Sequence, residues 1–207
     1  MGPLLRSFFS SQLIFYACRS GFEVITAAGK SNFEYVKALG ADAVFDSRAP
    51  DVGEEIREYT KDKLYYAWDT IGEFGSEEAC AKALASAAPE GKKLYYGTIL
   101  LKDISGFTER EGTFGPRPEV AYSMSLGYTA AGEEFEIGEN TFAARPEDYE
   151  FVKAWTPFAA GLVAEGKVKP HRVELREGGF EGILEGLEDL KSGKVSGKKL
   201  VYRVADP

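Results

Sequence analysis

Zinc-ligating residues are scarce in this chain of 207 residues. It contains one histidine, His171, and two cysteines, Cys18 and Cys80. A zinc site usually draws three or four ligands from these residue types at close spacing, so the sequence predicts no metal centre. Two cysteines far apart in sequence also form no disulfide framework, which favours a reducing, cytoplasmic setting.

Basic charge and long apolar runs are also in short supply. The 25 Lys and Arg residues are outnumbered by 33 Asp and Glu, giving a net charge of −8. An acidic chain is poorly suited to bind nucleic acid or anionic membranes. No segment approaches the length of a membrane span. The apolar run Leu13–Ala17 is separated from Phe8 and Phe9 by three polar residues, which argues against a signal peptide.

A β-α-β unit is predicted near the start of the chain. Phe22–Ile25 is an apolar, β-rich run. Ser31 with Glu34 has the spacing of a capping box, and Gly40 suits the left-handed end of the helix that follows. Ala43–Phe45 then begins a second strand. Because a helical crossover joins parallel strands, the sequence predicts an α/β fold with a parallel sheet.

The turn of this unit has the chemistry of an anion site. In NAD-binding folds, the strand here ends in a carboxylate that binds the adenosine ribose. This chain instead has Gly29, Lys30, Ser31 and Asn32 at the start of a helix. A neutral-to-positive turn suits a 2′-phosphate. The alternative, equally supported by the turn alone, is that Ser31 only caps the helix and Lys30 is solvated.

The glycine-rich loop of a complete dinucleotide fold is missing. A helix is predicted over Ser10–Ser20, and such a fold would place a strand and a G-x-G-x-x-G turn before it. Residues 1–9 contain one glycine, Gly2, outside that position. We therefore expect residues 1–9 to be irregular and the sheet to lack its first strand.

The carboxyl ends of two further strands predict the rest of a ligand crevice. Strands are expected over Leu64–Asp69 and Lys93–Leu100, so Asp69, Gly97, Thr98 and Ile99 lie at strand ends, where ligands of α/β sheets collect. Each of them is equally compatible with an ordinary strand end. The remaining expected elements are helices over 52–60, 75–87, 145–165 and 180–190, strands over 120–131, 169–175 and 193–204, and a long loop over 102–118.

Several motifs resemble those of one family. They are Lys37–Asp46, Glu165–His171, Gly182–Leu187 and Gly193–Val201, which are similar to the medium-chain dehydrogenase/reductase superfamily. Leu126–Ala130 followed by Gly132–Phe135 resembles, within it, the fungal trans-acting enoyl reductases of polyketide biosynthesis. The resemblance runs from about Ser10 to Val204 and implies a Rossmann-like sheet flanked by helices, followed by a C-terminal return segment.

The resemblance also implies roles for particular residues. Tyr128 is the best nominee for an acid, and the alternative that its residue type favours is a core or pocket-wall tyrosine. The resemblance makes NADPH the cofactor. Where this chain has Ser47, the family has a tyrosine, so stacking on the adenine side should be weaker. The positions matching cofactor contacts are Gly29, Lys30, Ser31, Asn32, Ser47, Thr98, Ile99, Val195 and Ser196; those matching the acyl pocket are Leu126, Gly127, Tyr128, Thr129 and Ala130.

The family's N-terminal GroES-like domain has no counterpart in the sequence. The expected division is therefore an irregular segment over 1–9, a truncated cofactor domain over 10–168, and a C-terminal segment over 169–207 that packs on the GroES-like domain in the family. Phe8, Phe9 and the apolar faces of the last helix and strand should then be exposed, favouring a homo-oligomer or a partner chain.

The activity that the resemblance implies is an NADPH-dependent enoyl reductase. Hydride would pass to an α,β-unsaturated acyl chain carried by a polyketide synthase, without zinc and without a nucleic-acid or membrane partner. The alternatives are a redox-inactive descendant that uses the acyl pocket for binding, cyclisation or isomerisation, and a truncated, inactive remnant. Fold likeness does not choose among them, because function depends on the site.

Overall fold

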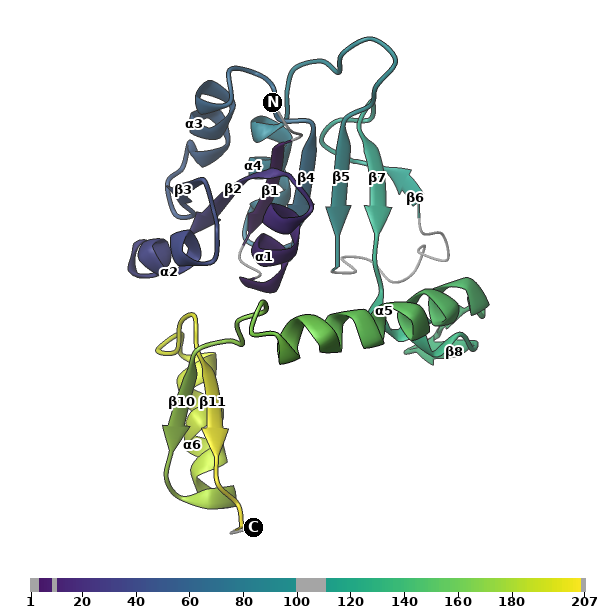
Figure 1. Ribbon diagram of the computed structural model, residues 1–207. Helices are drawn as coiled ribbons and strands as arrows, with labels where there is room; N and C mark the ends of the chain where they lie inside the picture. The colour runs from purple at the N-terminus through teal and green to yellow at the C-terminus, as the bar shows by residue number, and fades with distance from the viewer. Residues whose placement is uncertain (1–3, 9–10, 100–110, 206–207) are drawn as a thin grey trace. The chain divides into compact units, whose positions relative to one another are not determined.

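The computed structural model describes residues 4–8, 11–99 and 111–205. The chain divides into two compact units, Met1–Val168 and Lys169–Pro207. The N-terminal unit contains a sheet of seven strands in the order β3-β2-β1-β4-β5-β7-β6 (Figure 1), in which all neighbours are parallel except β6 and β7. Its strands are β1 (Leu4–Phe8), β2 (Glu23–Ala28), β3 (Ala43–Asp46), β4 (Tyr66–Asp69), β5 (Tyr95–Thr98), β6 (Glu111–Thr113) and β7 (Ala121–Met124).

Helices cover both faces of this sheet. Alternate residues of β2 divide between them: Val24 and Ala28 pack with α1 (Ser11–Arg19) and α2 (Phe33–Ala38). Ile25 and Ala27 pack with α3 (Val52–Tyr59) and α4 (Ser76–Ala83) on the other face. In Figure 1, α1 lies in front of β1 and α4 lies behind it. This doubly wound α/β arrangement is the Rossmann-like fold that the sequence predicts.

Glycines are required at three positions of this unit: Gly53 in α3, Gly40 after α2 and Gly97 in β5. A Cβ at Gly53 would lie 2.6 Å from Lys82 Cβ and 2.7 Å from Ala79 O, so glycine lets α3 press against α4. On the other face, Gly40 ends α2 with a φ of +113°, as its left-handed role predicts. The indole of Trp68 in β4 occupies the space where a side chain at Gly97 of β5 would lie.

The prediction that residues 1–9 are irregular is wrong for Leu4–Phe8. These residues form β1, which pairs in parallel with β2 on one side and with β4 on the other. The first strand of the sheet is therefore present, and only the glycine motif after it is missing from the sequence. The physical reason is tertiary, because both partner strands lie later in the chain and supply the hydrogen bonds.

The predicted capping box is also absent. Ser31 lies inside a 3-10 helix, η1 (Lys30–Asn32), and α2 begins after Asn32 with no side-chain cap. The Glu34 carboxylate instead accepts a hydrogen bond from Lys37 Nζ at 3.2 Å. The tighter turn closes the helix start through the backbone, since Asn32 N donates to Gly29 O at 2.8 Å.

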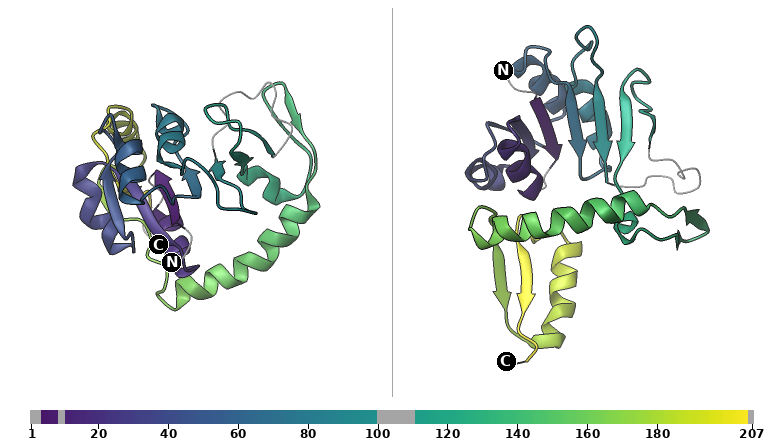
Figure 2. Two further views of the ribbon diagram at one scale, coloured as in Figure 1. Left: turned by 90° about the horizontal axis from the view of Figure 1, so that it is seen from above. Right: turned by 45° about the vertical axis from the view of Figure 1, so that its right-hand side comes forward.

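The predicted strand over residues 120–131 is shorter in the structure, and further elements follow it. Residues 120–131 give the short β7 and then a 3-10 helix, η3 (Gly127–Ala131), rather than one strand. A hairpin that the sequence did not indicate follows, formed by β8 (Phe135–Ile137) and β9 (Asn140–Phe142). The long α5 (Pro146–Ala164) contacts η3 and runs outside the sheet (Figure 2). Of the helices that the structure describes, none is long and apolar enough to cross a membrane.

The C-terminal unit is one β-α-β unit. Parallel strands β10 (Val173–Arg176) and β11 (Lys199–Tyr202) are joined through α6 (Gly179–Lys191). Gly182 and Gly186 let α6 approach the Tyr202 ring closely. The opposite side of α6 is apolar and exposed, which confirms the predicted patch for the last helix: Phe180, Leu184 and Leu187 are 73%, 69% and 54% exposed. The side chains of Phe8 and Phe9, named in the same prediction, lie outside the described parts.

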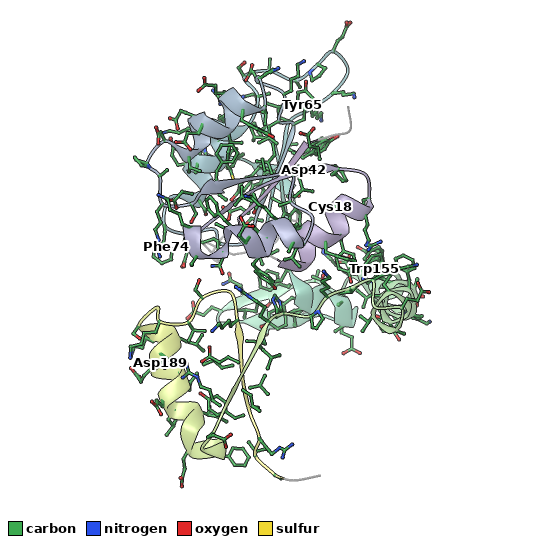
Figure 3. The ribbon with its side chains drawn as sticks, turned by 60° about the vertical axis from the view of Figure 1, so that its left-hand side comes forward. Cys18, Asp42, Tyr65, Phe74, Trp155 and Asp189 are labelled. Carbon is green, nitrogen blue, oxygen red and sulfur yellow. The ribbon has the colours of Figure 1, made fainter. Side chains whose placement is uncertain are left out.

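A charge network ties α6 to β10 in this unit. Arg176 donates to Asp189 Oδ2 at 2.7 Å and to Glu174 Oε1 at 2.8 Å. Lys194 and Lys198 complete it, each 2.9 Å from one of these carboxylates. Figure 3 labels Asp189 on α6. Hydrogen bonds from Arg176 and Lys194 lower the pKa of Asp189, and those from Lys198 and Arg176 lower the pKa of Glu174.

Acid should therefore weaken the C-terminal unit. Carboxylates with a lowered pKa in the folded state stabilise it above their unfolded pKa values, about 3.9 for Asp and 4.3 for Glu, and lose this contribution as pH falls. We expect the melting temperature to fall between about pH 5 and pH 3, and less steeply in Asp189→Asn. Thermal unfolding followed by circular dichroism across this range measures both.

The matched control for this experiment is Glu185→Gln, which removes an exposed carboxylate from the same helix. Its melting temperature should fall with pH as steeply as that of the unchanged protein. An equal slope in Asp189→Asn and the unchanged protein would contradict the assignment of acid sensitivity to the charge network.

Candidate functional site

The carboxyl ends of the parallel strands form one level edge. Phe8 of β1 is opposite Ala27 of β2 and Asp69 of β4 in the register, and Asp69 is opposite Thr98 of β5. Strand order reverses at β1, since β2 and β3 lie to one side of it and β4 and β5 to the other. Ligand crevices of open α/β sheets lie outside the carboxyl ends at such a reversal.

The turn after β2 brings together the residues predicted to bind phosphate. Lys30 and Ser31 are exposed, whereas Asn32 is buried. Lys30 Nζ lies 3.5 Å from Asp46 Oδ2 at the end of β3, and the Lys30 side chain is 80% exposed. Ser47 N donates to Ala28 O at 3.0 Å, which holds the loop after β3 against this turn. The sequence-predicted Gly29–Asn32 and Ser47 are therefore neighbours.

A pocket of about 630 Å³ opens between the loops that follow β3 and β4. Ser47 lines it, and an open volume of this size is typical of small-molecule sites. Sequence reasoning missed its other walls. They could have been noticed from Gly72 and Gly75, whose spacing after a strand end marks a tight loop around Phe74. The lining residues are Ser47–Pro50, Val52, Gly53, Ile71, Glu73–Ser76, Glu78, Ala79 and Lys82.

Asp69 is a structural residue of this edge and not a ligand-facing one. Its side chain is fully buried. Its carboxylate accepts hydrogen bonds from Ile71 N at 2.9 Å, Gly72 N at 3.0 Å, Ser76 Oγ at 2.6 Å and Tyr96 Oη at 3.1 Å. Burial, and next the charge of Asp69, raise the pKa of Tyr96. The four donors use the acceptor capacity of the carboxylate and fix the loop between β4 and α4.

The end of β5 has one residue facing inward and one facing solvent. Thr98 is 3% exposed and Ile99 is 45% exposed. Of these two predicted nicotinamide-side positions, Ile99 is thus the one with an accessible side chain. Gly97 is explained by its packing against Trp68, so it carries no evidence of a ligand.

The stretch Leu126–Ala130 begins two residues after the carboxyl end of β7, whose Met124 is opposite Thr98 of β5. Leu126 precedes η3, and Gly127–Ala130 lie in it. Thr129 Oγ1 donates to Leu126 O at 2.8 Å and closes the turn. Tyr128 is 66% exposed, and its ring lies 5.9 Å from that of Phe135. Both rings line a second pocket of about 510 Å³, with Ile137 and the acidic Glu133, Glu134 and Glu136.

Val195 and Ser196 belong to the C-terminal unit, between α6 and β11. Val195 is half-buried and Ser196 is exposed. Their role on the nicotinamide side stays a prediction.

Comparison with known proteins identifies the lineage. Residues 11–134 match the family model described as zinc-binding dehydrogenase. The chain belongs to the zinc-binding dehydrogenase family. The resemblance to the medium-chain dehydrogenase/reductase superfamily is thereby confirmed.

The curated relatives of this chain include fungal proteins. Trans-enoyl reductase ACTTS2 of Alternaria alternata is 36% identical over 189 residues, which are 91% of this chain and 50% of that protein. Trans-enoyl reductase FSL5 of Gibberella zeae is 37% identical over 186 residues, 89% of this chain and 48% of that protein. The chain thus spans about half the length of these curated relatives.

Solved structures share the fold of this dehydrogenase chain. The CurF ER cyclopropanase of the curacin A biosynthetic pathway matches with a TM-score of 0.67 and 17% identity, over 98% of this chain and 55% of that one. CurA from Vibrio vulnificus, solved in complex with NADPH, matches with a TM-score of 0.64 and 19% identity, over 100% and 58%.

The metal in the family's name does not fit the donor set of this chain. Across the described ranges, no three His, Cys, Asp or Glu side chains are grouped so that they could hold a metal ion. Cys80 is buried in the core. The Cys18 thiol donates to Gly40 O at 2.8 Å, and burial together with Asp42 raises its pKa, which disfavours the thiolate that binds metals.

Replacing Asp69 should destabilise the N-terminal unit strongly. Asp69→Ala leaves several buried donors without a partner, and each such donor costs about 1–3 kcal/mol, so we expect a loss of roughly 3 kcal/mol or more. Urea unfolding followed by circular dichroism measures this loss. Asp51→Ala, an exposed residue before α3, is the matched control. A loss in Asp69→Ala no larger than in the control would contradict the anchoring role.

Proposed function

We propose that the chain is the cofactor-binding half of an NADPH-dependent enoyl reductase. The observation that carries this proposal is the hydrogen bond from Ser47 N to Ala28 O, which joins the loop after β3 to the turn after β2. The exposed Lys30 and Ser31 of that turn thereby lie near a pocket large enough for part of a nucleotide. The names of its relatives as trans-enoyl reductases, and the NADPH of the similar CurA structure, support the same assignment.

The residues present divide naturally among the parts of NADPH. Lys30 and Ser31 offer a charge and a hydroxyl to the 2′-phosphate, and the pocket beside Ser47 has room for the adenosine. Thr98 and Ile99 lie further along the same edge, where the nicotinamide would bind. NADPH, when bound, supplies the hydride for the β-carbon of an α,β-unsaturated acyl chain. The chain's own part is to orient the cofactor and exclude water.

Tyr128 is the proposed proton donor to the α-carbon, and Leu126–Ala130 the proposed acyl-contacting stretch. The exposed phenol, in a pocket lined by Phe135 and Ile137 as well as by three glutamates, supports this role. Val195 and Ser196 are proposed nicotinamide-side residues, on the basis of the family resemblance. The acyl chain would be polyketide-like and carried by a synthase, and polypeptide matching the other half of the relatives would complete its site.

One part of the cofactor lacks its usual cradle. Between β1 and α1 the sequence reads Phe9-Ser10, without glycine. Glycine lets backbone N–H groups approach a pyrophosphate closely. We therefore expect the affinity for NADPH to depend mainly on contacts with the 2′-phosphate and with the adenine, and less on contacts with the pyrophosphate.

A redox-inactive role is the second candidate. The pocket lined by Tyr128, Phe135 and Ile137 is formed entirely by η3 and the segment through β8, without residues of the β2 turn. It would still be available to an acyl or polyketide ligand in a chain that does not bind NADPH. Binding of such a ligand without cofactor would favour this candidate.

Removing the charge at the β2 turn should weaken NADPH binding selectively. Hydrogen bonds to charged groups contribute about 1.5–3 kcal/mol, so Lys30→Ala should reduce NADPH affinity at least about tenfold and leave the weaker NADH binding unchanged. Isothermal titration calorimetry with both cofactors measures this. Lys63→Ala, an exposed lysine that precedes β4, is the matched control.

The opposite result has a clear meaning. If millimolar NADPH gives no heat of binding with the unchanged chain, the reductase role fails for this chain alone. If Lys30→Ala and Lys63→Ala lose the same affinity, the turn is not the phosphate site.

A further inference from the structure

We propose that Phe74 is a specificity residue that stacks on the planar base of a nucleotide held in the pocket between the β3–α3 and β4–α4 loops. The proposal deepens the proposed function, on which it rests, by naming the group that recognises the adenine.

Phe74 has a conformation that packing in the folded chain does not explain. Its side chain is 96% exposed, and its φ is +53°, a left-handed value that is rare for bulky residues. Exposure of an aromatic ring and a strained backbone both cost free energy, and such residues concentrate at ligand sites. Packing against the described residues of this unit therefore does not account for the position of the ring.

The loop that carries Phe74 is held firmly on both sides. Before it, the N–H groups of Ile71 and Gly72 donate to Asp69, and after it the Ser76 hydroxyl donates to the same carboxylate. Gly72 and Gly75 have φ values of +66° and +80°, which let the chain turn tightly around the ring. Figure 3 shows Phe74 at the outer surface of the N-terminal unit. The side chain is thus presented to solvent on a rigid base.

The pocket beside Phe74 suits a flat ring. Phe74 carries the one aromatic ring among the described lining residues. The other loop contributes Ala49 and Pro50, which give the pocket an apolar part beside its charged lining residues. Bases stack on aromatic side chains with little dependence on their hydrogen-bonding edges.

The surroundings select a nucleotide among planar ligands. The loop that contributes Ser47 is hydrogen-bonded to the end of β2, so the pocket adjoins the turn of Lys30 and Ser31. Arg48 and Lys82 line the pocket together with Glu73 and Glu78, and Lys82 Nζ lies 3.1 Å from Glu54 Oε1 and 3.8 Å from Glu78 Oε1. The positive charge offered to phosphate is therefore that of the exposed Lys30 side chain in the adjoining turn. A base attached to phosphates would satisfy the apolar slot and the nearby positive charge at once.

The test uses 2′,5′-ADP, which contains the base and the phosphates but no nicotinamide. Isothermal titration calorimetry on the full chain should show about tenfold weaker binding in Phe74→Ala and undiminished binding in Phe74→Trp. NADPH affinity should fall by the same factor, because it contains the same base. Since the Phe74 side chain is almost fully exposed, the urea midpoint of Phe74→Ala should not change. Phe180→Ala, an exposed phenylalanine of the C-terminal unit, is the matched control.

Each outcome decides a different statement. Unchanged 2′,5′-ADP affinity in Phe74→Ala overturns the stacking role and leaves the proposed function standing. If Phe74→Ala weakens 2′,5′-ADP binding while Lys30→Ala leaves the affinities for 2′,5′-ADP and NADPH unchanged, the stacking role is supported and the proposed NADPH-specific site at the β2 turn fails. Absence of any binding of 2′,5′-ADP or NADPH to the unchanged chain overturns both.

Discussion

The buried carboxylate of Asp69 is the interaction on which the functional edge depends. It joins the end of β4 to the following loop, to the start of α4 through Ser76, and to β5 through Tyr96. A buried charge is tolerated only when donors surround it, so these groups are held in one arrangement. The level row of strand ends and the loop bearing Phe74 are both consequences of that arrangement.

The central fold was predictable because its signals are local. The apolar run of β2, the glycine end at Gly40 and the start of β3 can be read within some twenty residues. β1 could not be found in this way, because its partners β2 and β4 come later in the chain. The Ser31–Glu34 pattern misled for a different, local reason, since a backbone hydrogen bond of η1 replaced the expected side-chain cap.

The candidate site was predictable where chemistry and strand ends coincide. Lys30 and Ser31 were expected from the turn after β2, and Ser47 from the family resemblance. The structure brings the turn and Ser47 together, and their role stays a proposal. Phe74 was not predictable, because an exposed aromatic residue between glycines has no periodic signal, and its meaning comes from a pocket formed with a distant loop. Asp69 and Gly97 were predicted as ligand-site residues because they lie at strand ends. The structure instead gives Asp69 hydrogen bonds within the fold and packs Gly97 against Trp68.

The indole of Trp68 rests where a Gly97 side chain would lie, one residue before the edge formed by Asp69 and Thr98. The chain has one other tryptophan, Trp155, which lies on α5. Tryptophan emission and near-ultraviolet dichroism are sensitive to the packing and polarity around the ring. The protein therefore carries an intrinsic optical reporter in the sheet, beside the strand ends. In a variant with Trp155 replaced, all tryptophan emission would come from Trp68.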